Sequence, residues 1–175
     1  MSDSLSGSLL IASPRMGDWF QRAVVLVVEH TEQGAFGLVL NRPSDATVGE
    51  AAPGLGELIG AEHRLHVGGP VAPEAITAIG EHLDPAASVK LVVDAAGMVD
   101  LDDPPELGRL RVFAGYAGWS EGQLDVEVDA EAWIVETALP DDLFEEDDEL
   151  WSRVLRRKGG EFALLAQMPA DPSLN

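Results

Sequence analysis

The residues best suited to bind a charged group lie in two short segments of the sequence. Arg42, in Asn41-Arg42-Pro43, is one of only 11 basic residues and follows an apolar run. A guanidinium there can grip a carboxylate or phosphate with two hydrogen bonds, although pairing with one of the many acids is the simpler interpretation. Gly68-Gly69-Pro70-Val71 offers backbone N–H groups ahead of a predicted helix, which can cradle an anion. A tight turn with positive φ is the simpler interpretation of these glycines, because no lysine or serine follows them as in a phosphate loop.

Aromatic residues beside glycines form a third candidate. Gly115-Tyr116-Ala117-Gly118-Trp119 places two rings next to residues that let a ligand or another backbone approach closely. The same rings could instead pack on a turn, and Gln123 could supply a polar contact or complete a helix cap. The resulting hypothesis is a ligand-binding site that holds an anionic group against an apolar wall. It consists of Asn41, Arg42, Gly68, Gly69, Tyr116, Trp119 and Gln123.

Signatures of known catalytic chemistry are missing from the sequence. There is no Gly-x-Ser-x-Gly elbow and no His-Glu-x-x-His motif, and the chain has no cysteine for a thiol nucleophile or thiolate metal site. His63 and His66 are three residues apart, but their segment is predicted to be a loop entering a strand. We therefore expect no metal and no cofactor. The alternative is an enzyme, a hydrolase or transferase, that uses His30 or an acid as general base.

Runs of apolar, often β-branched residues predict the strands that must position these groups. Val24 to Val28 is typical of a strand buried on both faces, and Ala35 to Leu40 is its expected hairpin partner. Further strands are predicted over Leu9 to Ala12, Leu65 to Val67, Val89 to Val93, Leu110 to Tyr116, Trp133 to Leu139 and Phe162 to Ala166.

Helix signals are fewer than strand signals. Pro73 to Ile79 is a predicted helix because proline occupies its first turn and Gly80 follows it. A second helix is predicted over Asp147 to Lys158, with apolar residues on one face and basic residues in its last turn. Ser120 to Glu131 fits either an alternating strand or a helix with a capping box.

Two segments are predicted to lack long regular elements. Ala95-Ala96-Gly97 is expected to be a turn, and Ser44 to Gly60 a loop with one short helix. The irregular order of strands and helices along the chain favours an α+β fold over a doubly wound one.

The charge of the chain limits its partners. The 175 residues include 31 acidic and 11 basic ones, a net charge of −20, which disfavours contact with a nucleic-acid backbone or an anionic membrane. Seven acids lie in Asp141 to Glu149, interpreted as a solvated face and helix start, and a basic cluster follows in Arg153, Arg156, Arg157 and Lys158. No segment has the length of a secretion signal or a membrane span, so a cytoplasmic protein without nucleic-acid or membrane partners is expected.

Short blocks along nearly the whole chain form a further pattern. They are Gly7-Ser8-Leu9-Leu10-Ile11-Ala12-Ser13-Pro14, Gly34-Ala35-Phe36-Gly37-Leu38-Val39-Leu40-Asn41-Arg42-Pro43, Gly68-Gly69-Pro70-Val71, Gly115-Tyr116-Ala117-Gly118-Trp119, Gly122-Gln123-Leu124 and Asp171-Pro172-Ser173-Leu174-Asn175. In this order they resemble the YqgE/AlgH family, largely uncharacterised bacterial proteins that are often labelled transcriptional regulators. The resemblance implies a single domain over residues 1–175 and an α+β fold. Its mixed β-sheet is expected to be branched and partly barrel-like, with helices packed outside.

These observations lead to one functional expectation and one alternative. We expect a non-enzymatic regulatory or binding protein that acts through a small anionic ligand or a protein partner. The label of regulator comes without a recognised DNA-binding motif in the family. The enzyme that uses His30 or an acid as general base is the alternative.

Overall fold

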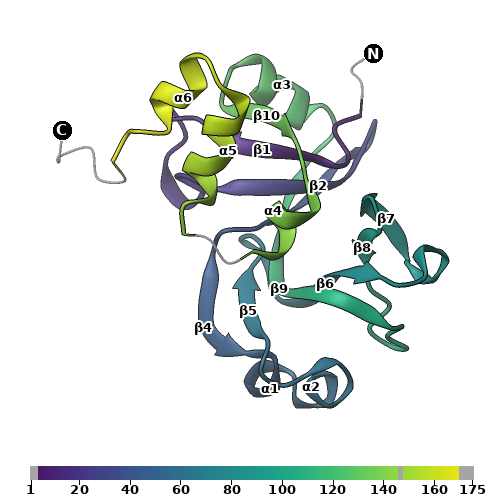
Figure 1. Cartoon of the computed structure of the whole chain (residues 1–175). Coiled ribbons are helices and arrows are strands. Elements are labelled where there is room, and N and C mark those ends of the chain that lie inside the picture. The colour runs from purple at the N-terminus through teal and green to yellow at the C-terminus, as the bar shows by residue number, and fades with distance from the viewer. Residues whose placement is uncertain (1–3, 146–147, 170–175) are drawn as a thin grey trace.

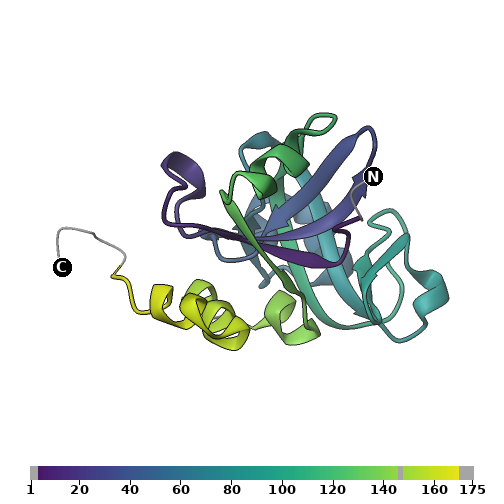
Figure 2. The same ribbon diagram turned by 90° about the horizontal axis from the view of Figure 1, so that it is seen from above.

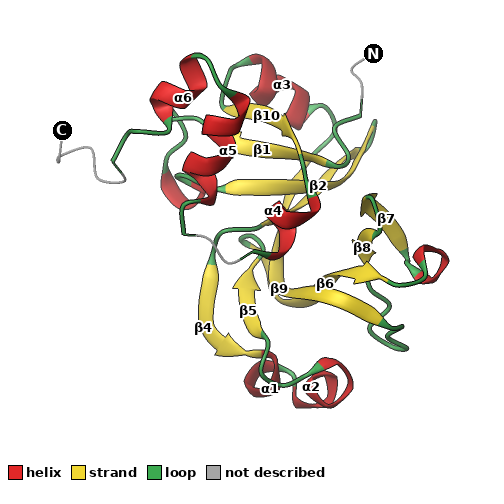
Figure 3. Ribbon diagram, in the orientation of Figure 1, coloured by secondary structure: helices red, strands yellow, loops and turns green. Residues whose placement is uncertain are grey.

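β-Strands dominate the structure, a computed structural model that describes residues 4–145 and 148–169 (Figures 1 and 3). The strands are β1 (Ser8–Ala12), β2 (Val24–Thr31), β3 (Gly34–Val39), β4 (Pro43–Thr47), β5 (Arg64–Val67), β6 (Val71–His82), β7 (Lys90–Val93), β8 (Ala96–Met98), β9 (Leu107–Trp119) and β10 (Trp133–Thr137). The helices are α1 (Val48–Ala51), α2 (Pro53–Ile59), α3 (Gln123–Asp129), α4 (Pro140–Phe144), α5 (Leu150–Lys158) and α6 (Glu161–Leu165). Two short 3-10 helices span Asp18–Phe20 and Pro85–Ala87.

The long strand β9 is the point at which the sheet branches. The ten strands form one sheet in the order β10-β1-β2-β3-β9-β6-β8-β7, and β5 and β4 branch off from β9. One side of β9 pairs with β6, whereas the other side pairs with β5 in parallel and then with β3 in antiparallel register. Strands β10 and β7 end the path, so the sheet is not a closed barrel. The predicted α+β fold with a branched mixed sheet is confirmed.

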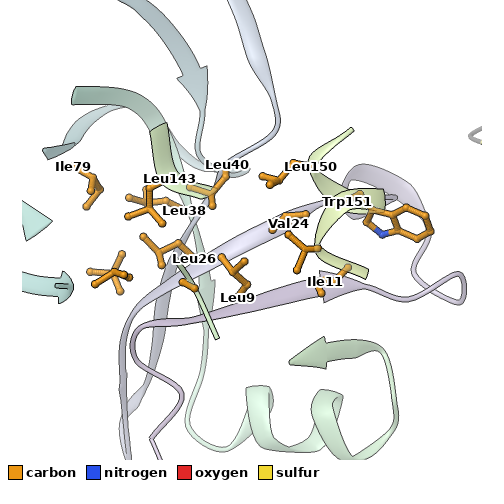
Figure 4. Packing of buried hydrophobic residues seen from close by; sticks show 14 of the residues in the cluster. Leu9, Ile11, Val24, Leu26, Leu38, Leu40, Ile79, Leu143, Leu150 and Trp151 are labelled. Carbon is orange, nitrogen blue, oxygen red and sulfur yellow. The ribbon is translucent and has the colours of Figure 1, made fainter. Parts of the chain in front are cut away.

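Apolar side chains on both faces of β2 hold the helices against the sheet. Val24, Leu26 and Val28 point to one face, whose core includes residues of α4 and α5 (Figure 4). Val25 and Val27 point to the other face, where Leu124 of α3 packs. Because side chains alternate along a strand, a continuous apolar run is what a strand covered on both faces requires. The helices α3 and α5 therefore lie on opposite faces of the sheet (Figure 2).

Most predicted strands are present, and the segment predicted as either a strand or a helix proves to be a helix. Ser120 to Glu131 contains the helix α3, which begins at Gln123 after Gly122, a residue with a φ of 74°. Gln123 Oε1 accepts the N–H of Ser120 at 3.0 Å, but the N-cap is Gly122 and no side chain caps the helix, so the predicted capping box with Ser120 as N-cap is not formed. The helix predicted from Asp147 is α5, which begins at Leu150, and Asp147 itself lies outside the described residues.

Four local predictions were wrong. Pro73 to Ile79 belongs to β6, where Pro73 falls in a register shift between Val71 and Ile76, so its missing N–H breaks no ladder bond. Phe162 to Ala166 forms the helix α6 instead of a strand, because positive φ at Gly159 and Gly160 turns the chain back onto α5. The turn at Ala95 to Gly97 contains the start of β8. The loop Ser44 to Gly60 contains the end of β4 and two helices.

Candidate functional site

The glycines of the predicted anion site lie where the sheet branches. A Cβ on Gly69 would lie 2.0 Å from the carbonyl carbon of Tyr116, and one on Gly68 would lie 2.3 Å from the oxygen of Gly115. The N–H of Gly68 donates to Ala114 O at 2.9 Å. These contacts let the backbone cross β9 closely, which only glycine permits. The expected helix after the glycines is a strand, so no helix dipole faces them, and anion binding here stays a prediction.

Asn41 and Arg42 fasten the end of the β2–β3 hairpin to the preceding loop. Asn41 Oδ1 accepts the N–H of Val24 at 2.9 Å, and Asn41 Nδ2 donates to the carbonyl of Arg22 at 2.9 Å. The Arg42 guanidinium donates to the backbone carbonyls of Trp19 and Gln21. Burial lowers the pKa of Arg42 from its ordinary value. Both side chains thus have structural partners, and neither needs a ligand to satisfy its polar atoms.

Trp119 and Gln123 meet at a carboxylate that the sequence reasoning missed. Glu127 Oε1 accepts the indole N–H of Trp119 at 3.1 Å and that of Trp133 at 2.9 Å. Glu127 Oε2 accepts Gln123 Nε2 at 2.9 Å. This carboxylate ties α3 to β9 and β10. The spacing of four residues between Gln123 and Glu127 was a signal that both share one helix face.

The seven predicted residues are not gathered in any of four cavities formed by the described part of the chain. Tyr116 packs against Phe36 with ring centroids 4.9 Å apart. Of four cavities lined by the described residues, one includes Asn41 and another Trp119, and none includes more than one of the seven. Their joint role as a ligand site therefore stays a prediction.

His30 anchors the segment that precedes β1. Its Nδ1 accepts the N–H of Leu5 at 3.0 Å, its Nε2 lies 3.7 Å from Asp125, and its side chain is 7% exposed. A general base needs a free lone pair facing substrate, and here the accepting nitrogen is already occupied by a backbone donor. Within residues 4–145 and 148–169, no three acidic or histidine side chains gather as a metal site would require.

A groove of about 630 Å³ lies at one edge of the sheet, and no sequence motif marks it. Figure 2 shows β10 running between α3 on one face and α5 and α6 on the other. The lining residues come from the loop after β1, the end of α3, strand β10, and the helices α5 and α6. They are Ser13, Pro14, Arg15, Val128, Glu131, Trp133, Ile134, Val135, Lys158, Glu161, Phe162 and Leu165. Its apolar walls and charged rim are typical of a binding site.

A buried carboxylate holds the helix α5 in place beside this groove. The side chain of Asp142 is 2% exposed and accepts two hydrogen bonds from Arg157, at 2.9 and 2.8 Å. Asp142 Oδ2 also accepts the N–H of Leu139 at 2.8 Å, and the carboxylate holds the pKa of Arg157 above its ordinary value. The interpretation of Asp141 to Glu149 as a solvated face is therefore wrong for Asp142. Glu146 and Asp147 of that run lie outside the described residues.

The fold and the groove define the class of protein. It is an α+β protein in which helices cover both faces of a branched sheet and leave a groove open at the β10 edge. None of the helices among the described residues combines the length and the apolar character needed to cross a bilayer.

The chain belongs to the AlgH-like family, whose model matches residues 9–163. It is 44% identical to a UPF0301 protein of Thermobifida fusca, over 98% of this chain and 96% of that protein. A UPF0301 protein of Streptomyces avermitilis is also 44% identical, over the same shares of the two chains. The predicted membership of the YqgE/AlgH family is confirmed, and the relatives in these comparisons are bacterial proteins whose names state no activity.

Solved structures agree with this assignment. A crystal structure of a protein from Corynebacterium diphtheriae matches with a TM-score of 0.84 and 30% identity, over 95% of this chain and 93% of that one. The solution structure of the AlgH protein from Pseudomonas aeruginosa matches with a TM-score of 0.72 and 31% identity, over 97% of each chain. The branched fold is therefore shared by relatives with less than a third of their residues in common.

Proposed function

We propose that this protein is a non-enzymatic, cytoplasmic binding protein with a regulatory role, and that the groove beside β10 binds a polypeptide segment of a protein partner. The observation that carries the proposal is the groove itself, about 630 Å³ with apolar residues from three elements along its walls. A volume of this size is typical of binding sites, and a groove bounded by helices and one strand suits an elongated occupant.

The charges support a protein partner over a nucleic acid. A net charge of −20 repels phosphate backbones at long range, so a regulatory role would be exerted through a protein. Three of the four residues in the basic cluster already have partners, because Arg153 and Arg157 pair with Asp142 and Lys158 donates to Val135 O. The lack of cysteine agrees with a reducing compartment such as the cytoplasm.

A peptide selection tests this function directly. Random dodecamers displayed on phage would be selected on the immobilised protein, and the tightest binder would be labelled and titrated against variants. Leu165→Ala removes an apolar wall of the groove and is expected to weaken binding about tenfold. Leu164→Ala, on the same helix but 69% exposed and outside the groove, is the matched control and should not change the affinity. If Leu165→Ala also left the affinity of every selected peptide unchanged, the groove would not be the binding site.

A small anion is the second candidate, at a different place. His66, which is 4% exposed, has an Nδ1 atom without a partner among the described residues, and it lines a cavity of about 50 Å³. Arg64 and Arg111 line the same cavity, and Glu145 and Asp148 oppose an anion there. Titration calorimetry with formate should give binding that Arg64→Gln weakens at least tenfold, and equal affinities for both proteins would remove this candidate.

A further inference from the structure

Strand β10 is an edge strand whose backbone faces the groove. Within the described part of the chain it pairs with β1 on one side only, and three consecutive residues, Trp133 to Val135, line the groove. Side chains of consecutive strand residues point to opposite faces, so a cavity can reach all three only along the edge. The groove therefore follows the free edge of the sheet.

The hydrogen-bond pattern fixes which backbone groups point outward. Ser13 N donates to Ala132 O at 3.0 Å, so residues 132, 134 and 136 direct their N–H and C=O groups toward β1. The alternate residues, Trp133, Val135 and Thr137, direct theirs to the free edge. Lys158 Nζ lies on that side and donates to Val135 O at 2.8 Å, which agrees with this phase.

Two cations on α5 cover this edge in different ways. Arg157 donates to Thr137 O at 3.0 Å and is anchored by the buried Asp142 carboxylate, so it closes the edge at that end. Lys158 donates to Val135 O, and its ammonium also lies 5.1 Å from the centre of the Phe162 ring. Among the described residues no carboxylate holds Lys158, and a flexible lysine can turn away into water. The edge from Trp133 to Val135 is thus covered by the Lys158 ammonium, which another donor can displace.

We propose that a partner protein adds a β-strand to the edge of β10, with a backbone N–H replacing the Lys158 ammonium on Val135 O. This proposal rests on the function proposed above and specifies how the segment binds. The Val135 N–H donates to a carbonyl of the added strand, which gives the pair of backbone bonds typical of strand addition. Alternate side chains of the segment pack on Val128 on one wall and on Phe162 and Leu165 on the other.

The net charge of the chain indicates which kind of segment binds to the edge of β10. The chain carries 31 acids against 11 basic residues, so two copies repel each other and a segment flanked by lysine or arginine is attracted. The groove lining itself is balanced, with the acids Glu131 and Glu161 and the bases Arg15 and Lys158, so this attraction comes from the net charge of the whole chain. The occupant is therefore an extended segment of a different protein, apolar at alternate positions and basic at its ends. Its binding weakens as salt is raised.

The decisive variant removes one backbone donor. Val135→Pro deletes the outward N–H, which an edge strand tolerates because no ladder bond is lost, and Val135→Thr keeps both the N–H and the side-chain shape. With the labelled phage-selected dodecamer as probe, we expect Val135→Pro to weaken binding at least tenfold and Val135→Thr to leave it within threefold. Lys158→Ala should strengthen binding about fivefold, because the competing donor is gone.

Hydrogen exchange tests the same bond without a substitution. Saturating the wild-type protein with the dodecamer should slow exchange of the Val135 amide at least tenfold. The Ile134 amide faces β1 and serves as the internal control. If Leu165→Ala weakens binding but Val135→Pro and the Val135 exchange rate show no effect, strand addition is overturned and the groove keeps its proposed function.

Two other results would be decisive. If no selected peptide responds to Leu165→Ala, both the proposed function and the strand addition fail. If sedimentation shows a wild-type dimer that Val135→Pro dissociates, the occupant is a second copy of this chain and the proposed partner is wrong.

Discussion

The buried histidine His66 is expected to make the stability of this protein fall as the solution becomes acidic. His66 on β5 is 4% exposed and packs near the Phe113 ring, with centroids 6.1 Å apart. Burial, together with the positive charges of Arg111 and Arg64, lowers the pKa of His66 from 6.5 to about 4. The folded protein therefore resists protonation of this ring.

The sign and the size of the effect follow from proton linkage. Between pH 6.5 and pH 4 the unfolded chain binds a proton at His66 and the folded protein does not, so the free energy of unfolding falls as the pH falls. The full shift corresponds to about 3 kcal/mol, and about 2 kcal/mol of it is lost between pH 7 and pH 5. Above pH 6.5 the residue has no effect, because both states are neutral.

His66→Phe isolates this contribution, because it keeps an aromatic ring of similar size and removes the titrating nitrogens. Urea unfolding followed by tryptophan fluorescence would be measured at pH 7 and pH 5 for both proteins. The wild type should lose about 2 kcal/mol more than the variant over this interval, since carboxylates elsewhere affect both proteins alike. Equal losses in the two proteins, together with an NMR titration of His66 near pH 6.5, would refute the reasoning.

Three further substitutions test the contacts that hold the fold. Gly69→Ala places a Cβ 2.0 Å from backbone of Tyr116 and should cost about 3 kcal/mol in urea unfolding, whereas Gly54→Ala meets no atom within 4 Å and should be neutral or slightly stabilising. Asp142→Ala leaves its arginines without the buried carboxylate and should cost about 3 kcal/mol, and a loss below about 1 kcal/mol would contradict the clamp. Glu127→Ala removes the acceptor of two indoles and should cost about 2 kcal/mol and shift the tryptophan emission, whereas Glu127→Gln should retain most of the stability.

Strands that are buried on both faces could be predicted from the sequence, because each of their residues is apolar. Val24 to Val28 is apolar at every position because both faces of β2 are covered. Strand β6 shows no such pattern, and Pro73 and Gly80 near its ends are also helix signals. It is a strand because it pairs with β9. The short helix α6 has too few residues to show a helical period, and its packing against α5 decides its conformation.

The candidate site, too, could be predicted from the sequence only in part. Gly115 was recognised as a position of close approach, whereas Gly68 and Gly69 were interpreted as an anion cradle or a tight turn. Sequence alone could not say that the group approaching all three is the backbone of the sheet. The groove could not be predicted from the sequence, because it depends on the order of the strands in the sheet. Nothing in Trp133 to Thr137 says that this strand ends the sheet, or that α6 returns beside it.

The unequal cover of the β10 edge separates protection from binding. Natural sheets guard a free edge with charged side chains against pairing with other chains, and two anchored cations would serve that purpose best. Here Arg157 is fixed by a buried carboxylate, whereas Lys158 donates to Val135 O beside the Phe162 ring, and no carboxylate among the described residues holds it. The movable cation lies over the stretch that opens into an apolar groove. Because few contacts hold Lys158 at this place, a competing backbone donor can displace it. The edge of β10 is therefore suited to docking as far as Arg157, whose anchored guanidinium closes it.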